Sequence, residues 1–331
     1  MIFGLNTPPV SLAPMAGYSD SAMRTVCAYM GSDYSVTEMI SAKAVTYKDG
    51  KTFSLARIRV GEGRVGLQLF GKEPSIVAEA AAMISGGYTA LPGCAGEEQF
   101  LPPAAIDINM GCPVNKIFGN GEGSALMASP SLIYDIVKQS AAAIDIPLTV
   151  KLRAGIDSGR INAVECALAA EEGGAALVCI HGRTRADMYS GYADRGIIAR
   201  VKEALKIPVI ANGDIRCAED ALSMLRDTGA DGIAVGRGAV GNPFIFREIK
   251  AALGGGKYKG PTADERIEVA LWQLRLAIED KGERVAVNEA RKQIAEYFKG
   301  HRGCAALRGE INRATTYSEV ETAINRSVKE N

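Results

Sequence analysis

The sequence is poor in the residues that most often hold metals. Its 331 residues include only two histidines, His181 and His301, and a single tryptophan. Seven cysteines are present, but no two of them have the spacing C-x-x-C. Zinc and iron–sulfur sites need clusters of cysteine or histidine ligands, so the composition predicts no metal centre. An odd number of cysteines without such a pattern is typical of a reduced, cytoplasmic protein.

The sequence also lacks a long apolar run and an excess of charge of either sign. No stretch approaches the roughly 18 apolar residues that a membrane helix requires. We therefore expect no membrane span. No basic residue precedes Arg24, so we expect no signal peptide either. The 38 basic and 38 acidic residues balance each other. This balance argues against indiscriminate binding of polyanions, but it leaves room for a local basic patch.

Short apolar runs alternate regularly with helical patterns along most of the chain. Eight β-like runs lie at 10–15, 34–39, 64–70, 105–110, 147–152, 176–180, 208–212 and 231–235. Several are apolar almost throughout, which is typical of parallel strands buried on both faces. Helical patterns between them cover 20–30, 74–84, 130–143 and 161–174, and several begin at a capping residue or a proline. Eight strand–helix units over about 240 residues predict a (β/α)8 TIM barrel.

The alternation stops near residue 254, where the run GGGKYKGP begins. The rest of the chain has a helical pattern, in which Ile267, Leu271 and Leu274 recur at helical spacing. We therefore expect a barrel domain over 1–253 and a small C-terminal all-α domain over 254–331. The longer connection at 86–104 is expected to be a surface insertion before the fourth strand.

Polar residues gather at the carboxyl ends of the predicted strands. In barrel enzymes the chemistry takes place at this end, because the loops that follow the strands meet there. Lys151 and Arg153 alternate along one strand and so share a face. The segments NGD (212–214) and GRG (236–238) end strands seven and eight, which is the usual phosphate site of such barrels. A Rossmann site at GRGAVG is not expected, because no acidic residue follows at the required distance.

Cys112 occupies an unusual place among the cysteines, in the segment DINMGCPVNK. It follows a predicted strand end and stands between Gly111 and Pro113, which places it on a loop at the barrel mouth. An inert buried thiol is the ordinary role of a free cysteine. A thiol on such a loop can also act as a nucleophile or as a proton donor, and the residues alone leave both open.

Nine segments, in order along the chain, resemble the tRNA-dihydrouridine synthases, and most of all their bacterial B-type branch. They are APMAGYSD, EMISAKA, QLFG, DINMGCPVNK, GNGEGSALM, VKLRAGID, IHGRTRADMYSGYAD, IPVIANGDI and GIAVGRGAVGNPFIF. The likeness continues in the tail with EARKQIAEYFKG. Two positions depart from the family pattern: Arg195 replaces a usual tryptophan, and Phe118 stands where a charged or small residue is commoner.

The resemblance implies an enzyme that binds FMN, takes electrons from NADPH and acts on tRNA. The flavin would pass hydride to C6 of a uridine while Cys112 protonates C5, giving 5,6-dihydrouridine. Asn109, Arg153 and Arg183 are implied to bind the uracil. The implied flavin site consists of Pro14, Met15, Ala16, Gln68, Lys151, His181, Asn212, Gly213, Asp214, Gly236 and Arg237.

The helical tail is basic in a protein that is neutral as a whole. Between residues 291 and 313 it has six basic and two acidic residues. Such a run is usually only a solvated helix face, but with the resemblance it favours contact with the tRNA backbone. The residues implied to contact tRNA are Lys116, Arg185, Tyr189, Arg291, Lys292, Lys299 and Arg302. A dihydroorotate dehydrogenase-like barrel acting on a free pyrimidine is the main alternative, and it has no need of a basic tail. A tRNA-binding protein without catalysis is disfavoured by the intact polar set at the strand ends.

Overall fold

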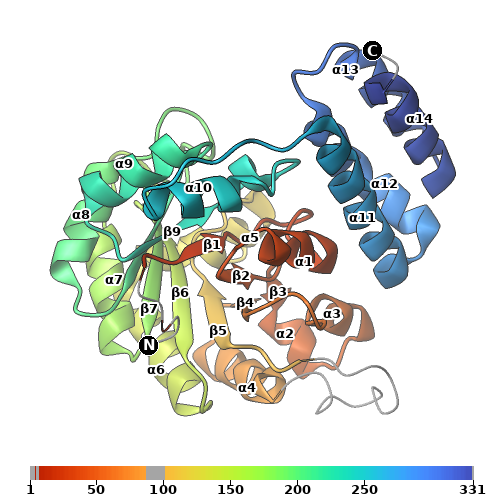
Figure 1. Ribbon diagram of the computed structural model, residues 1–331. Helices are drawn as coiled ribbons and strands as arrows, with labels where there is room; N and C mark the ends of the chain where they lie inside the picture. The colour runs from red at the N-terminus through yellow and green to blue at the C-terminus, as the bar shows by residue number, and fades with distance from the viewer. Residues whose placement is uncertain (1–3, 5–6, 87–100, 330–331) are drawn as a thin grey trace.

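The structure is a computed structural model that describes residue 4 and residues 7–86 and 101–329. Most of the expected insertion at 86–104 lies outside these residues, as does Cys94. The chain forms a closed barrel of parallel strands with helices around it, and further helices follow at the C-terminal end (Figure 1).

In the described part of the chain, nine strands form one parallel sheet that closes on itself. The order around the barrel is β2-β1-β9-β8-β7-β6-β5-β4, and a pairing between β2 and β4 closes the ring. The strands are β1 (Val10–Leu12), β2 (Tyr34–Val36), β3 (Ile40–Ser41), β4 (Val65–Phe70), β5 (Ala105–Asn109), β6 (Leu148–Arg153), β7 (Leu177–His181), β8 (Val209–Asn212) and β9 (Gly232–Val235). Nearly all their residues are buried, which explains the apolar runs in the sequence. The predicted (β/α)8 barrel is confirmed.

Helices connect successive strands on the outside of the barrel. They are α1 (Ser21–Tyr29), α2 (Ala42–Thr46), α3 (Gly50–Leu55), α4 (Pro74–Ser85), α5 (Asn115–Gly119), α6 (Pro130–Ala142), α7 (Ala163–Glu172), α8 (Arg195–Ala204), α9 (Ala218–Thr228) and α10 (Ile245–Leu253), with the 3₁₀ turns η2 (Gly123–Ala128) and η3 (Arg237–Ala239). The predicted starts of three helices are confirmed. Asp20 accepts the N–H of Met23 at the start of α1, and a proline begins both α4 and α6.

The second predicted strand is wrong as a continuous element over 34–39. The strand β2 ends at Val36, and a separate short strand, β3, begins at Ile40; both pair with β4. Between them, the N–H of Gln68 donates to the hydroxyl of Thr37 at 3.0 Å. The Thr37 N–H still donates to the Gly66 carbonyl at 2.9 Å, but its side-chain oxygen then takes the place of a backbone carbonyl, so the ladder of the sheet is interrupted after Thr37.

The chain after α10 is helical, as the sequence predicts. It contains α11 (Ala263–Lys281), α12 (Glu283–Ile294), η4 (Ala295–Phe298), α13 (Cys304–Arg313) and α14 (Tyr317–Lys329). A capping box of Thr262 and Glu265 begins α11, and Gly282, with a φ of 76°, makes the turn into α12. None of the helices among the described residues combines the length and apolar character needed to cross a bilayer. The division into two domains at 253/254 stays a prediction, because one hydrophobic core includes residues of both parts.

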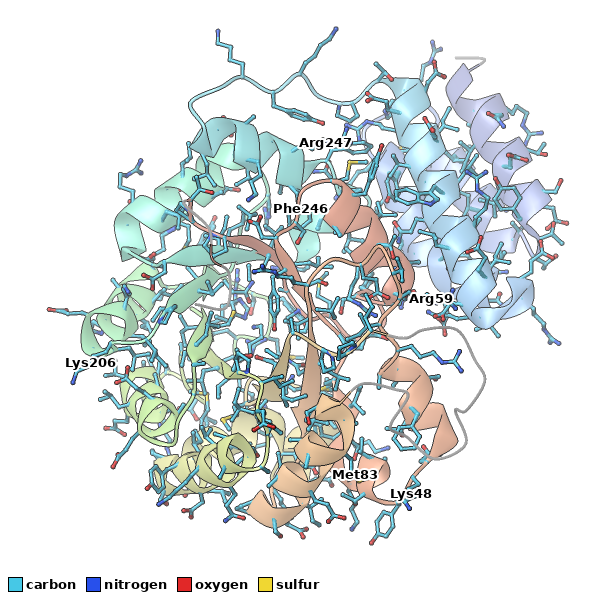
Figure 2. All side chains as sticks on the ribbon, turned by 60° about the horizontal axis from the view of Figure 1, so that its bottom comes forward. Lys48, Arg59, Met83, Lys206, Phe246 and Arg247 are labelled. Atoms are coloured by element: carbon cyan, nitrogen blue, oxygen red, sulfur yellow. The ribbon has the colours of Figure 1, made fainter. Side chains whose placement is uncertain are left out.

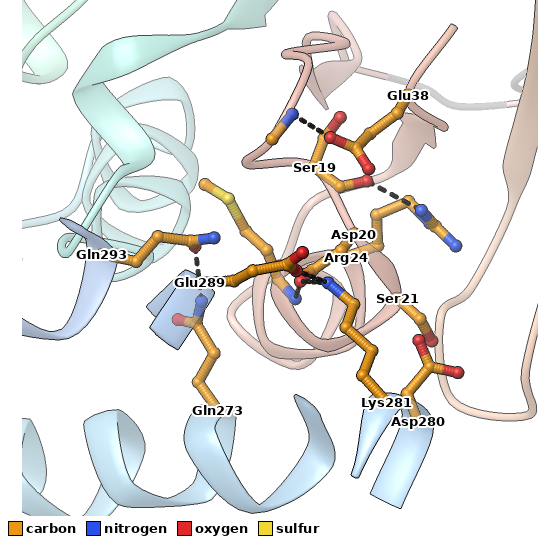
Figure 3. A network of polar contacts seen from close by, with 12 residues as sticks. Ser19, Asp20, Ser21, Arg24, Glu38, Gln273, Asp280, Lys281, Glu289 and Gln293 are labelled. Carbon is orange, nitrogen blue, oxygen red and sulfur yellow. Dashed lines mark hydrogen bonds and ion pairs between the residues drawn. The ribbon is translucent and has the colours of Figure 1, made fainter. Parts of the chain in front are cut away.

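A polar network fastens α11 to the barrel beside α1 (Figure 3). The ammonium of Lys281 lies 2.8 Å from the carboxylates of both Asp20 and Glu289. Burial of this ammonium opposes its charge, but the two carboxylates outweigh burial and raise the pKa of Lys281. Arg59 donates to Asp280 at 2.9 Å and lies where the barrel meets the C-terminal helices (Figure 2). The helices are therefore held beside the loop that follows β1.

Candidate functional site at the mouth of the barrel

A chain of hydrogen bonds leads from the barrel interior to its mouth. Thr149 Oγ1 donates to Asp107 Oδ1 at 2.5 Å, and Gln68 Nε2 donates to Asp107 Oδ2 at 2.7 Å. Asn109 Nδ2 then donates to Gln68 Oε1 at 2.8 Å. The strand register brings these side chains together, because Asp107 is paired with Gln68 on one side and with Thr149 on the other. Gln68 and Asn109 are thus fixed by neighbours within the protein.

Asp107 belongs to this chain of hydrogen bonds, but it was not identified from the sequence as a residue of the site. Its carboxyl is only 3% exposed, so burial raises its pKa, while the hydrogen bonds from Gln68 and Thr149 lower it in part. The signal in the sequence is an acid inside the apolar run AIDIN. Asp107 stands two positions before Asn109 and so shares its face of the strand. It orients Gln68 from below the mouth.

Asn109 also holds the loop that carries Cys112. Its Oδ1 accepts the N–H of Cys112 at 2.9 Å and the N–H of Gly111 at 3.2 Å. On the other side of the loop, Ser124 Oγ donates to the Cys112 carbonyl at 2.7 Å. Gly123 has a φ of 61°, and a Cβ there would lie 3.0 Å from the Cβ of Cys112. The loop is therefore closely built around the cysteine.

The Cys112 thiol lies on the mouth loop, as predicted, but its side chain is largely buried. The residue is 8% exposed. Burial raises the pKa of the thiol, and the Val114 N–H and the charge of Arg153 offset only part of this rise. A thiol with a raised pKa stays protonated at neutral pH, which suits a proton donor better than a nucleophile.

Lys151 and Arg153 point to the same face of β6, and the structure brings both to the mouth. Lys151 Nζ donates to Asn212 Oδ1 at 3.0 Å. Arg153 donates from Nε to the Gly111 carbonyl at 2.7 Å, and from Nη1 to the carbonyls of Thr184 and Met188 at 2.8 and 3.0 Å. Burial lowers the pKa of both side chains. Arg153 thereby ties the Cys112 loop to the loop after β7.

The predicted phosphate loops after β8 and β9 are joined by charged side chains. Arg183 Nη2 donates to both carboxylate oxygens of Asp214 at 2.8 Å, and the Ala193 N–H donates to Asp214 Oδ2 at 2.8 Å. Burial acts to raise the pKa of Asp214, but these hydrogen bonds and the charges of Arg183 and Arg237 outweigh it and lower the pKa. Arg237 Nη2 lies 3.6 Å from Asp214 Oδ1, and its side chain is 51% exposed.

Arg183 is almost fully enclosed, like Arg153. The residue is 2% exposed, and its guanidinium also donates to the carbonyls of Ser190 and Gly191 at 2.9 and 2.7 Å. These two carbonyl contacts and the two to the Asp214 carboxylate fix the loop after β7 against Asp214. The assignment of Arg183 to the uracil stays a prediction.

His181 lies at the end of β7 among cations. Burial is the main cause that lowers its pKa well below the ordinary value, and the charges of Lys151, Arg153 and Arg183 add to the effect. The imidazole is therefore neutral at physiological pH. Gly213 lies against it: a Cβ at this position would be 3.1 Å from His181 Cδ2. A glycine is needed for this close approach, and its φ of 132° also favours glycine.

The loops that follow the first and last barrel strands meet at the same mouth. A Cβ on Gly236 would lie 3.7 Å from the sulfur of Met15. Pro14 and Met15 are partly buried and Ala16 is exposed, so this turn borders the mouth. The residues predicted for one flavin site thus come from β4, β6, β7 and β8 and from the loops after β1, β8 and β9, and they lie together at the carboxyl ends of the strands.

The family model for dihydrouridine synthase matches residues 11–331. The chain belongs to the dihydrouridine synthase family. A probable tRNA-dihydrouridine synthase 1 of Synechocystis sp. is 39% identical over 96% of this chain and 85% of its own length. A probable tRNA-dihydrouridine synthase of Treponema pallidum is 37% identical over 89% of this chain and 85% of its own. The tRNA-dihydrouridine synthase B of Pseudomonas putida is 36% identical over 91% and 86%.

Among solved structures, a histamine dehydrogenase from Rhizobium sp. 4-9 is similar in fold. The TM-score is 0.53 at 13% sequence identity, over 81% of this chain and 49% of that enzyme. The chain therefore spans about half the length of that enzyme. At this identity the likeness supports the barrel architecture alone.

Around the mouth of this dihydrouridine synthase family member, the predicted tRNA contacts on the barrel loops lie at the surface. Lys116 is exposed. The Arg185 guanidinium lies 4.2 Å from the centre of the Phe118 ring and donates to Asn115 Oδ1 at 2.6 Å. The exposed Tyr189 ring lies between the guanidinium groups of Arg153 and Arg237, at 5.9 and 4.9 Å. Phe118, a departure from the family pattern, thus supports a predicted RNA contact.

The predicted tRNA contacts on the C-terminal helices differ in their exposure and in their partners. Lys292 is exposed, and its ammonium lies 4.6 Å from the centre of the Tyr18 ring, beside the loop after β1. Lys299 and Arg302 are exposed as well. Arg291 instead donates to the carbonyl of Ala314 at 2.5 Å and so joins α12 to the end of α13. The structure places Lys292 nearest to the mouth.

The described residues also bear on metal binding and on Arg195, which stands where the family usually has a tryptophan. Over residues 7–86 and 101–329, histidine, cysteine and acidic residues form no cluster that could hold a metal ion, and the six described cysteines are free. Arg195 pairs with Asp227 at 2.6 Å on the surface between α8 and α9. This departure from the family pattern therefore forms an ion pair outside the mouth.

Proposed function

We propose that this protein is an FMN-dependent tRNA-dihydrouridine synthase that uses NADPH as electron donor and works in the cytoplasm. The observation that carries the proposal is the set of ionisable groups that lie at the barrel mouth with Cys112. A thiol with a raised pKa, an imidazole with a lowered pKa and the Lys151 ammonium lie at the carboxyl end of the barrel, in a chain of the dihydrouridine synthase family. These groups fit a reaction that needs a proton donor beside a reduced flavin ring.

The residues at the mouth fit a flavin phosphate ester. An ammonium has three donors, and that of Lys151 makes one hydrogen bond within the described residues, so donors are available for the polar edge of the flavin ring. Gln68 and His181 would share this edge, and Pro14, Met15 and Ala16 would lie along the ring. Gly236 leaves space where a side chain would otherwise stand.

The ribityl chain and phosphate would be held by the loops after β8 and β9. The residues are Asn212, Gly213, Asp214, Gly236 and Arg237. Arg237 is half exposed beside Asp214, so its guanidinium can turn to a phosphate without leaving a buried charge unpaired. This supports the choice of FMN over a flavin without phosphate.

Bound FMN, once reduced by NADPH, supplies the hydride that adds to C6 of the uracil. Cys112 gives its proton to C5, so that the C5–C6 double bond becomes a single bond and the thiolate is reprotonated from solvent. Its low exposure keeps the proton on sulfur until that step. Arg153 and Asn109 fix the loop of Cys112 from two sides, and we assign the orientation of the uracil to them.

The substrate is proposed to be a uridine turned out of the RNA stack. A base in a stack cannot reach a barrel mouth, and its extrusion costs a few kcal/mol. Contacts along the RNA backbone can offset this cost. Lys116, Arg185 and Tyr189 on the barrel loops, with Lys292, Lys299 and Arg302 on the helices, would supply them.

The test uses the flavin-loaded protein with tRNA that lacks dihydrouridine. We expect NADPH to be consumed and dihydrouridine to be found at defined positions when the tRNA is mapped base by base. A parallel reaction with NADH measures the preference for the electron donor. No dihydrouridine in tRNA, together with turnover of free dihydroorotate, would replace this proposal by that of a dehydrogenase acting on a free pyrimidine.

A further inference from the structure

The interruption between β2 and β3 directs three consecutive residues to three different parts of the site. The Thr37 hydroxyl accepts the N–H of Gln68 at 3.0 Å. The Glu38 carboxylate accepts the N–H of Gly17, in the loop after β1 (Figure 3). The sulfur of Met39 lies 3.8 Å from Asn109 Nδ2. Residues 37–39 thus join β4, the loop after β1 and β5 at the point where the second strand ends.

The Gly17 contact is made with a turn that is otherwise closed on itself. The N–H groups of Tyr18 and Ser19 both donate to the Met15 carbonyl, at 2.9 and 3.0 Å, and the Met15 N–H donates to Ser19 Oγ at 2.9 Å. The Gly17 N–H points the other way, to Glu38. The turn is therefore braced by its own hydrogen bonds, and Glu38 is an acceptor that joins it to the segment after β2.

The opposite side of this turn is bounded by the C-terminal helices. Gly17 has a φ of 75°, and a Cβ there would lie 2.7 Å from Lys292 Nζ. Glu38 is partly buried at its place. Burial raises the pKa of Glu38, the Gly17 N–H lowers it, Asp20 raises it, and Lys281 and Arg24 lower it. The turn that carries Met15 and Ala16 is thus held between Glu38 on one side and Lys292 on the other.

We propose that residues 37–39 are a positioning element of the flavin and uridine site, in which Glu38 fixes the Met15–Ala16 turn against the flavin ring. Thr37 fixes Gln68 in the same way, from the same break in the strand. The inference rests on the proposed function, because that function assigns Met15, Ala16 and Gln68 to the flavin. Glu38 acts through the Gly17 N–H and is a positioning residue. Precise ligand geometry requires such support behind the contacting groups.

The experiment compares Glu38→Ala, Glu38→Gln and the control Glu203→Ala, which removes an exposed acid of α8. Apoprotein of each variant is titrated with FMN, and quenching of flavin fluorescence gives the Kd. We expect Glu38→Ala to bind FMN about tenfold more weakly, the effect of one lost hydrogen bond that orders the site. Glu38→Gln should stay within about threefold of wild type, because its amide oxygen still accepts the Gly17 N–H. The control should equal wild type.

A second pair of variants tests the same element if Glu38→Ala does not fold. Thr37→Ser keeps the hydroxyl that accepts the Gln68 N–H, whereas Thr37→Val removes it at similar volume. We expect weaker FMN binding and a shifted flavin absorption band for valine alone.

The outcomes separate this inference from the proposed function. Wild-type FMN affinity in Glu38→Ala overturns the positioning role. Equal weakening in Glu38→Ala and Glu38→Gln also overturns it, since charge rather than the acceptor would then matter. If wild-type protein takes up no FMN, the proposed function itself fails. If it takes up FMN but forms no dihydrouridine, the tRNA assignment fails while the test of Glu38 still stands.

Discussion

The cations at the barrel mouth and those on the C-terminal helices are held in opposite ways. Arg153 and Arg183 are 3% and 2% exposed, and most of their hydrogen bonds go to backbone carbonyls. Lys292, Lys299 and Arg302 are exposed, and Lys299 has only a loose contact of 3.8 Å with Glu296. The mouth is therefore arranged before any ligand binds, while the helices present charge to the solvent.

This contrast teaches that two kinds of positive charge serve two purposes in one protein. A buried guanidinium with fixed partners gives geometry, and its loss leaves those partners unsatisfied. An exposed ammonium gives long-range attraction that salt screens. Substitutions in the two regions should therefore differ in kind as well as in size.

The largest effect is expected for Cys112→Ala, which removes the proton donor from the mouth and leaves the cations in place. Turnover of tRNA should fall by about 10²- to 10⁴-fold, the usual contribution of a general acid. FMN affinity and tRNA affinity should stay close to wild type. Cys217→Ala, at the start of α9, serves as the control and should keep full activity. Full activity in Cys112→Ala would remove the proton-donor role.

The next largest effect is a difference in stability: replacing a buried arginine should cost more free energy of unfolding than replacing an exposed one. Arg183→Met removes the charged partner of Asp214, which keeps only the Ala193 N–H and the distant Arg237, and takes the donor from two carbonyls; it should lower the free energy of unfolding by about 3 kcal/mol. Arg308→Met breaks an ion pair with Glu296 whose side chains are 50% and 30% exposed, and should cost less than about 1 kcal/mol. Urea unfolding followed by circular dichroism measures both. Equal losses would show that the two regions do not differ as described.

The pH dependence of turnover tests the state of the thiol. An acid works only when protonated, so its contribution is present below its pKa and is lost above it. Because the pKa of Cys112 is raised above the ordinary value of about 8.5, kcat should be flat through that pH and fall tenfold per unit only at higher pH. A decline of kcat that begins below pH 8 and disappears in Cys112→Ser would contradict the raised pKa.

The smallest effect is expected from the helices. The double variant Lys292→Ala and Arg302→Ala should weaken tRNA binding several-fold and reduce the slope of log Kd against log salt by roughly one unit per lost phosphate contact. The matched control is Lys138→Ala with Lys206→Ala, two exposed lysines on the outside of the barrel. Equal effects of both pairs would mean that only the overall charge matters.

The sequence predicts the barrel and its catalytic end well, because both depend on local patterns. Buried parallel strands have apolar runs, and polar residues at their ends mark the mouth. The break at 37–39 is different, since the run YSVTEM has the pattern of a single strand. The strand nevertheless ends at Val36, where the hydroxyl of Thr37 accepts the N–H of Gln68. That partner is 31 residues away, and no local rule reveals it.

The roles of individual polar residues were also only partly predictable. The place of Lys151, Arg153 and His181 at the mouth could be predicted because they stand at or near strand ends. Asp107 was missed because it lies two positions before a strand end and acts through Gln68. Arg291 has the sequence features of an RNA contact, yet it binds the carbonyl of Ala314. Charge can be read along a chain, but the direction of a long side chain depends on the helix packed beside it.

The unbroken hydrophobic core has a consequence for how this chain can be divided. Met23 and Val26 of α1 belong to the same core as Leu271 and Leu274 of α11. A chain ending at residue 253 would leave this face of α1 open to water and liable to self-association. The C-terminal helices are therefore needed to keep the barrel soluble, whatever partner they also bind.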